Sequence, residues 1–170
     1  FVGREPEKEL EMLGDLQGGL GDALETLRDL ARGIYPPLLA DKGLPSAVEA
    51  QSRKASMPVR VETDGIGRYS QESEAAVYFC VLEALQNASK YAEASDVTVR
   101  LWQENSDLLF SVADDGRGFD RETTSLGAGL QNMTDRLAAL DGTLDIRSRP
   151  GGGTTVSGRI PVQSRQAPLK

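Results

Sequence analysis

Three polar side chains on one predicted helix have the spacing and the chemistry of a nucleotide site. Glu83, Asn87 and Lys90 stand at offsets of four and three residues, which places them on one face of a helix. A carboxamide oxygen is a hard ligand suited to Mg²⁺, an ammonium group attracts phosphate oxygens, and a carboxylate one turn back could orient water or complete a metal shell. A solvated polar helix face is the alternative interpretation.

A second candidate is an acidic residue followed by glycines where a predicted strand ends. The run is Val112-Ala-Asp114-Asp-Gly116-Arg-Gly118-Phe, whose glycines let the backbone bend closely around a flat ligand. The Asp114 carboxylate could then accept a hydrogen bond from an exocyclic amine. Adenine offers such an amine, whereas guanine presents an acceptor at the matching position. An ordinary Asp-Gly turn between strands is the alternative interpretation.

A third candidate is a pair of glycines that opens a predicted helix. In Gly127-Ala-Gly129-Leu130, free N–H groups at the positive end of the helix dipole would form an anion site for phosphates. No Gly-Lys-Ser/Thr follows, and Asn132 stands where a dinucleotide motif would have its third glycine. A plain linker is the alternative interpretation.

The fourth candidate is the run Gly151-Gly-Gly153-Thr154 before the last predicted strand. By itself, this run is also compatible with a simple hairpin loop. All four features involve groups suited to a nucleotide, and they follow one another in a fixed order along the chain. The combination is therefore more specific than any one feature.

The elements that must position these residues follow from the spacing of apolar residues. The predicted helices are residues 7–33, 45–55, 71–92 and a helix from about 129 to 140, and the predicted strands are residues 58–63, 97–101, 108–112, 143–147 and 154–161. Pro36 and Pro37 are expected to end the first helix. Strand pairs joined by short turns predict an α+β fold, a two-layer α/β sandwich preceded by an N-terminal helix, with a mixed or antiparallel sheet covered by helices on one face.

Composition excludes several classes of function. The 170 residues carry 19 Lys and Arg against 26 Asp and Glu, a formal charge of −7, with no His and one Cys. No nucleic-acid partner is expected for an acidic chain without a basic run. The chain can form no His-activated nucleophile, His-ligated metal site or internal disulfide. No run of about 18 apolar residues predicts a membrane span, so no membrane contact is expected. Cys80 lies among apolar residues and is expected in the core.

Together, the four features resemble the N box and the three glycine boxes of the ATPase superfamily that includes gyrase and the sensor histidine kinases. The resemblance covers about residues 71–161. Upstream, Leu27-Arg-Asp-Leu-Ala-Arg-Gly-Ile-Tyr-Pro-Pro-Leu-Leu-Ala-Asp-Lys-Gly-Leu resembles the second dimerisation helix and linker of histidine kinases of the nitrate-sensor (NarL-partner) type. The resemblance implies a partial dimerisation helix and linker at 1–40, an ATP-binding catalytic domain at 41–162 and a disordered tail at 163–170.

The resemblance also implies ATP and Mg²⁺ as cofactors and assigns a role to each motif. Asn87 would hold Mg²⁺, Glu83 would support the metal or a water, and both are the implied catalytic residues. Lys90 would face the phosphates, and Asp114 would read the adenine amine. The other residues assigned to the nucleotide site shape the adenine pocket or bound a short lid: Gly116, Gly118, Gly127, Gly129, Leu130, Gly153 and Thr154.

The function implied by the resemblance is that of the catalytic domain of a two-component sensor histidine kinase. Such a domain donates the γ-phosphoryl group of ATP to a histidine, for relay to a response regulator. Because this chain contains no His, the acceptor is expected on a helix outside it, and the start at Phe1 also suggests a piece of a longer protein. The parent is expected to be a cytoplasmic homodimer, with or without a membrane tether. Tyr91 stands where the family commonly has His and cannot carry its positive charge.

Two alternatives belong to other classes of function. A serine kinase of the anti-sigma type would use the same fold, but a Pro36-Pro37 linker after a dimerisation-like helix argues against it. A non-catalytic nucleotide-binding or partner-binding module would need neither a complete metal site nor an acceptor. The presence of Glu83, Asn87 and Asp114 argues against such a degenerate site.

Overall fold

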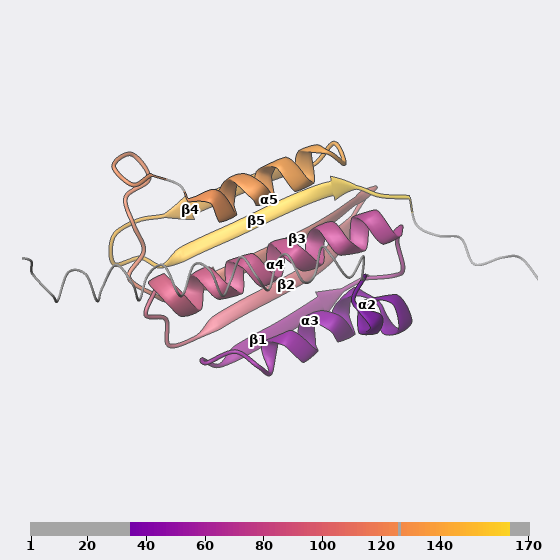
Figure 1. Ribbon diagram of the computed structural model, residues 1–170, viewed down its shortest axis with the longest axis horizontal. Helices are drawn as coiled ribbons and strands as arrows, with labels where there is room; N and C mark the ends of the chain where they lie inside the picture. The colour runs from indigo at the N-terminus through magenta and orange to yellow at the C-terminus, as the bar shows by residue number, and fades with distance from the viewer. Residues whose placement is uncertain (1–34, 126, 164–170) are drawn as a thin grey trace, which may run out of the picture. The chain divides into compact units, whose positions relative to one another are not determined.

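The computed structural model describes residues 35–125 and 127–163, drawn in colour in Figure 1. The chain divides into two compact units, Phe1–Tyr35 and Pro36–Lys170. The helix predicted over residues 7–33 lies outside the described residues, as does nearly all of the predicted C-terminal tail. The architecture given below is that of the second unit.

Five strands form one mixed sheet in the order β1-β2-β3-β5-β4. The strands are β1 (Val59–Asp64), β2 (Val97–Glu104), β3 (Asp107–Asp114), β4 (Thr143–Ser148) and β5 (Thr154–Pro161). β2 and β3 form the predicted antiparallel hairpin, whose turn includes Asn105 at a φ of 53°, a left-handed conformation that asparagine tolerates. β1 and β2 pair parallel because a helix crosses between them.

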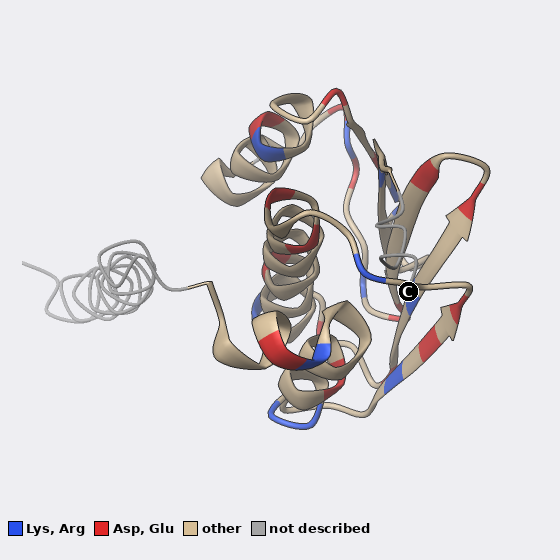
Figure 2. Ribbon diagram, turned by 90° about the vertical axis from the view of Figure 1, so that its right-hand side faces the viewer, with Lys and Arg blue, Asp and Glu red and all other residues tan. Residues whose placement is uncertain are grey.

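The helices of the described residues cover one face of this sheet, as Figure 2 shows. They are α2 (Pro37–Lys42), α3 (Leu44–Ser52), α4 (Gln71–Tyr91) and α5 (Ala128–Ala138). Alternate apolar residues of β2 and β3 are buried, which gives the sheet one face for the core. These residues are Val97, Val99, Leu101, Leu108, Phe110 and Val112. The predicted two-layer α+β fold with a mixed sheet is confirmed.

The sequence prediction missed α2. Pro36 and Pro37 were expected only to end a preceding helix, but Pro37 is the first residue of α2, where its missing N–H costs no hydrogen bond. Gly43, at a φ of 85°, then ends α2 and lies directly before α3. The predicted helix over residues 45–55 is shorter in the structure and ends at Ser52.

The long helix α4 carries three of the predicted site residues and is anchored at its start and along its length. The Ser70 hydroxyl accepts a hydrogen bond from the Ser73 N–H at 3.2 Å and caps the helix. Cys80 is fully buried in the middle of α4, which confirms it as a core residue. This burial raises the pKa of Cys80 to about 12, so the thiol stays protonated and unreactive at neutral pH.

Candidate functional site

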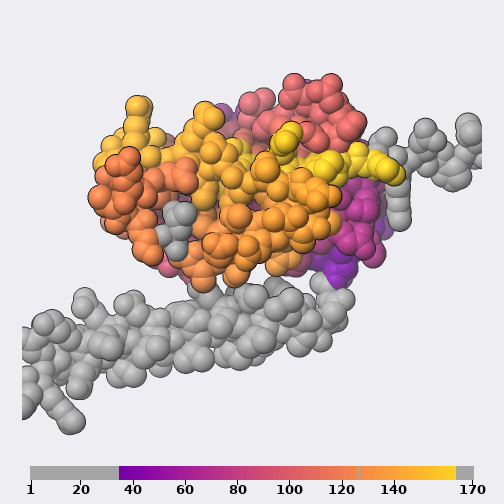
Figure 3. Space-filling model, turned by 90° about the horizontal axis from the view of Figure 1, so that it is seen from above, coloured from indigo at the N-terminus to yellow at the C-terminus, as the bar shows by residue number. Residues whose placement is uncertain are grey.

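The four sequence features gather at one end of the described domain. In Figure 1 the last turn of α4, the end of β3, the start of α5 and the start of β5 all lie toward the left. The strand register agrees, because Asp114 lies opposite Val97 on one side and Thr154 on the other. Figure 3 shows the loop that joins β3 to α5, in orange-red, at the same end of the molecule.

Asp114 is held with one carboxylate oxygen already used by the backbone. Its Oδ1 atom accepts hydrogen bonds from the Gly116 N–H at 2.9 Å and from the Thr154 N–H at 3.3 Å. Within the described residues, Oδ2 has no hydrogen-bond partner, and the side chain is half-buried. The carboxylate is therefore fixed in orientation and keeps one oxygen available for a ligand donor.

Glycine is required around Asp114 by close backbone packing. A Cβ on Gly116 would collide with the carbonyl oxygen of Ala92, at the end of α4. Gly153 has a φ of 70°, and a Cβ there would collide with the carbonyl oxygen of Asp114. Gly118, at a φ of 61°, packs in the same way against the carbonyl oxygen of Arg149. These three predicted glycines are thus brought together with Asp114.

The glycines at the start of α5 differ from one another. Gly127 is the residue before α5, and among the described residues no side chain caps the helix there and no atom beyond its chain neighbours lies within 4 Å of a Cβ built on it. Gly129 lies in the first turn beside half-buried Leu130, and a Cβ there would collide with the Glu83 carboxylate of α4. The start of α5 is therefore next to the polar face of α4.

We expect substitution by Ala to lower the thermal stability at Gly116 but not at Gly127. Gly116→Ala should destabilise the domain by about 1–3 kcal/mol, because the obstructing atom is backbone and cannot turn aside. That is a fall in Tm of roughly 2–12 °C for a domain of this size. Gly127→Ala, with open space around it and a φ of −69°, should leave Tm within about 2 °C. Thermal unfolding of both variants checks this, and equal losses would contradict the close packing at Gly116.

Glu83 and Asn87 lie half-buried, one turn apart on α4, and Lys90 is exposed in the last turn. In the described part of the chain, neither the Glu83 carboxylate nor the Asn87 amide has a hydrogen-bond partner. Desolvation by burial raises the pKa of Glu83. The pair therefore presents a carboxylate and a carboxamide that no other described side chain uses.

The raised pKa of Glu83 predicts a pH-dependent stability difference. A carboxyl whose folded pKa lies above its unfolded pKa stabilises the fold most at low pH, and this contribution is lost as the pH rises through the folded value. Glu83→Gln should therefore raise the Tm of the ligand-free chain at pH 8, with a gain that shrinks toward pH 4. Thermal unfolding of both proteins across this range measures the difference, and a gain that grows toward low pH would contradict the assignment.

The donor set at this site fits a magnesium ion shared with a ligand. Among the described residues no group of three or more His, Cys, Asp or Glu side chains is placed to hold a metal by itself. Magnesium commonly takes one or two protein oxygens and completes its shell with water and phosphate oxygens. Glu83 and Asn87 supply such a pair.

Sequence reasoning missed Ser148, which joins three segments of the site. Its hydroxyl accepts a hydrogen bond from the Phe119 N–H at 2.9 Å, donates to the Gly153 carbonyl at 3.2 Å, and lies 2.8 Å from the Thr154 hydroxyl. Ser148 thereby ties the end of β4 to both glycine loops. A single serine at a strand end has no motif around it, so the sequence held no signal for this role.

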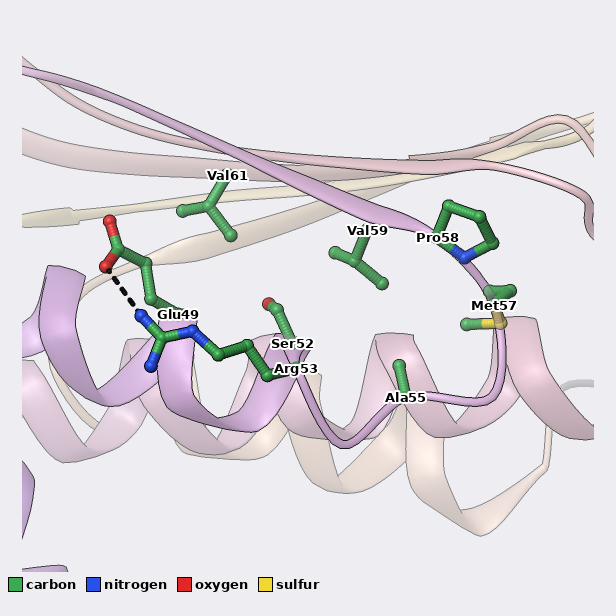
Figure 4. A pocket seen from close by; sticks show the side chains of 8 residues that line it. All are labelled: Glu49, Ser52, Arg53, Ala55, Met57, Pro58, Val59 and Val61. Carbon is green, nitrogen blue, oxygen red and sulfur yellow. Dashed lines mark ion pairs between the residues drawn. The ribbon is translucent and has the colours of Figure 1, made fainter.

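A groove of about 460 Å³ lies between α3 and β1 and shares no residue with the nucleotide candidates. Figure 4 shows Val59 and Val61 of β1 on one side and Ser52 of α3 on the other, with the Glu49–Arg53 ion pair at its rim. The Ser52 hydroxyl is buried, and no group in the described part of the chain forms a hydrogen bond with it. The motifs are therefore not in this groove.

Comparison with protein families decides the classification. Residues 72–164 match the family described as "Histidine kinase-, DNA gyrase B-, and HSP90-like ATPase". The chain belongs to this family. The match spans every predicted motif from α4 to β5, so the resemblance to the ATPase superfamily is confirmed, and ATP is the ligand of this ATPase domain.

Individual relatives of this ATPase domain agree with the family. The chain is 31% identical to the sensor histidine kinase MctS of Rhizobium johnstonii, over 86% of this chain and 34% of MctS. It is 30% identical to the signal transduction histidine-protein kinase/phosphatase DegS of Brevibacillus brevis, over 87% of this chain and 44% of DegS. The chain therefore spans less than half the length of either curated relative.

A solved structure supports the fold. The blue-light activated histidine kinase of Erythrobacter litoralis EL346 superposes with a TM-score of 0.59 at 22% identity, over 85% of this chain and 51% of that chain. At this identity the likeness shows the fold alone. In the described residues of the ATPase domain, no helix is both long and apolar enough to cross a membrane.

Proposed function

We propose that this chain is the ATP-binding catalytic domain of a two-component sensor histidine kinase. It would bind Mg·ATP and donate the γ-phosphoryl group to a histidine outside these 170 residues. The observation that carries the proposal is the convergence of Asp114, with one carboxylate oxygen available, and the Glu83–Asn87 pair at the end of the domain where α5 begins. The names of the two curated relatives support the kinase assignment.

At the adenine end, the proposed role of Asp114 is to accept a hydrogen bond from the exocyclic amine through Oδ2. The backbone bonds of Gly116 and Thr154 to Oδ1 hold the carboxylate in place for this contact. Gly118 and Gly153 keep the surrounding loops close to one another. Guanine has an acceptor at the matching position, so the site would favour ATP over GTP.

At the phosphate end, the proposed ligands come from α4 and from the start of α5. Asn87 would hold Mg²⁺, with Glu83 supporting the metal or a water, and Lys90 would face the phosphates. When bound, Mg²⁺ would neutralise charge that develops on the transferred phosphoryl group. The first turn of α5, which no described side chain caps, would offer its N–H groups to phosphate oxygens, with Gly127, Gly129 and Leu130 next to them.

The finer assignment rests on the sequence upstream of the domain. Residues 27–44 resemble the dimerisation helix and linker of kinases of the nitrate-sensor (NarL-partner) type. On that basis we assign residues 1–40 to this helix and linker and residues 41–162 to the catalytic domain. The parent would be a homodimeric kinase, with its catalytic domain in the cytoplasm and with or without a membrane tether, that passes the phosphoryl group to a response regulator.

The test is thermal unfolding of the chain with and without Mg·ATP, followed by transfer of labelled phosphate. Ligand at 100 times its Kd should stabilise the domain by about 2.7 kcal/mol, or roughly 5–10 °C in Tm. Mg·GTP is the matched control and should give a smaller shift. A fragment of the parent kinase that carries the acceptor histidine should then become labelled in trans. Absence of any shift at millimolar Mg·ATP would reject the proposal, and ATP binding without label transfer would favour a binding module.

A further inference from the structure

The loop that directly follows Asp114, called the Asp114 loop below, is attached to α4 and to the segment after it by a set of hydrogen bonds that no motif predicted. One Asp115 carboxylate oxygen accepts hydrogen bonds from the Ser95 N–H at 2.8 Å and the Asp96 N–H at 2.9 Å. The Asp115 N–H donates to the Asp96 carbonyl at 3.3 Å. The segment that follows α4 is therefore held by the residue next to Asp114.

Arg117 makes a second attachment, to the last turn of α4 itself. Its backbone N–H donates to the Ala92 carbonyl at 2.8 Å, and its side-chain Nε–H donates to the Tyr91 carbonyl at 2.7 Å. The last carbonyls of a helix have no partner inside the helix, and a cation at that end interacts favourably with the helix dipole. Arg117 thus caps the C-terminus of α4 from a different part of the chain.

These attachments connect the two halves of the proposed site. Asn87 and Lys90 lie in the last turns of α4, whereas Asp114 lies at the end of β3. One nucleotide has to contact both at once, so the distance between the two elements must match the length of the ligand. A ligand that joins two binding groups gains affinity only when the distance between the two subsites matches the distance between those groups.

We infer that Asp115 and Arg117 are positioning residues of the nucleotide site, which hold the Asp114 loop against the end of α4 at the spacing that ATP requires. The inference rests on the proposed function. Neither residue has to touch the nucleotide, because both act through backbone groups of other residues. Hydrogen bonds from the Asp96 and Ser95 N–H groups lower the pKa of Asp115, which is consistent with bonds to its ionised form.

The test separates binding of whole ATP from binding of its two halves. Asp115→Ala removes the acceptor, and Arg117→Met removes the side-chain donor while it keeps the length of the aliphatic chain. Each variant should weaken Mg·ATP binding about tenfold, since small misplacements of one subsite against another carry costs of this order. NMR titration measures the Kd of adenosine alone and the Kd of Mg·tripolyphosphate alone. Both Kd values should stay within about twofold of wild type, because each subsite is intact.

Conservative variants of Asp115 and Arg117, and variants far from the nucleotide site, serve as controls for the loss of Mg·ATP binding. Asp115→Asn keeps an acceptor oxygen, and Arg117→Lys keeps a donor, so both should bind Mg·ATP within about threefold of wild type. Asp107 and Arg159 form an ion pair at 2.9 Å at the opposite end of β3 from Asp114. Asp107→Ala and Arg159→Met should leave Mg·ATP binding unchanged.

Three outcomes would overturn the inference. If Asp115→Ala and Arg117→Met bind Mg·ATP as tightly as wild type, the spacing does not depend on them. If adenosine binding falls as much as ATP binding, the residues shape the adenine pocket itself rather than its position. If the wild-type chain binds neither Mg·ATP nor adenosine nor Mg·tripolyphosphate, the proposed function fails, and the inference fails with it.

Discussion

Replacing Asp114 by Asn is expected to lower the affinity for Mg·ATP about 100-fold or more, since a hydrogen bond to a charged group is worth roughly 1.5–3 kcal/mol and a wrong partner adds to the loss. The reason lies in the donors around this side chain. Oδ1 accepts from two backbone N–H groups, those of Gly116 and Thr154. An Asn oxygen facing these groups turns its NH₂ toward the adenine amine, and the flipped amide turns NH₂ toward the backbone donors. Either orientation brings two donors together.

The measurement is the Mg·ATP-induced shift in Tm at a fixed ligand concentration. At a concentration 100 times the wild-type Kd, a 100-fold weaker variant keeps only about 0.4 kcal/mol of stabilisation, or roughly 1–2 °C. Asp107→Asn is the matched control, because Asp107 begins the same strand and pairs with exposed Arg159 at the far end. It should retain the full shift. An undiminished shift in Asp114→Asn would remove this carboxylate from the adenine site.

The parts of the fold that the sequence predicts are those with a strong local pattern. α4 and the β2–β3 hairpin were found from apolar spacing because each buries one continuous face against the other layer. α2 was missed because Pro36-Pro37 is compatible with two structures, the end of one helix and the first turn of another. With six residues, α2 is also too short for an apolar period to show.

The candidate site was predictable to the extent that its residues form motifs. Asp114, Gly116 and Gly153 lie together as the order of motifs suggested. Ser148 was not predictable, because its role depends on where β4 places it beside two loops that are distant in the sequence. The sequence also does not distinguish Gly116 from Gly127, since both are glycines of a predicted loop motif. Only the structure shows that Gly116 packs against a carbonyl oxygen, whereas Gly127 has no such neighbour among the described residues.

The hydrogen-bond partners of the acidic side chains could not be predicted from the sequence either. Asp114 and Asp115 are neighbours in the sequence with the same functional group, yet in the structure their carboxylates bind different backbone groups. Asp114 turns toward Gly116 and Thr154, and Asp115 turns toward the segment after α4. The sequence records that two acidic residues are adjacent. The Asp115 partners and the Thr154 partner of Asp114 lie 19 to 40 residues away along the chain, so the sequence does not distinguish the two side chains.

Replacing Asn87 by Ala is the second change with a large expected effect, and it should act on phosphoryl transfer rather than on nucleotide recognition. Asn87 and Glu83 present the side-chain oxygens proposed for Mg²⁺, and no hydrogen bond within the described residues occupies the Asn87 amide. Charge neutralisation by a bound metal contributes several kcal/mol to reactions of this kind, so label transfer to the acceptor fragment should fall by about 100-fold or more.

The decisive measurement for Asn87 compares nucleotide binding with and without the metal. In EDTA, ATP binding by Asn87→Ala should stay within about threefold of wild type, because the substitution leaves the proposed adenine contact of Asp114 intact. On adding Mg²⁺, the wild-type affinity should rise while that of the variant does not. Gln86→Ala is the control, since Gln86 is the preceding residue of α4 and is exposed. It should keep both the gain from Mg²⁺ and the transfer rate. A variant that loses ATP binding equally with and without Mg²⁺ would show that Asn87 contacts the nucleotide directly instead of through the metal.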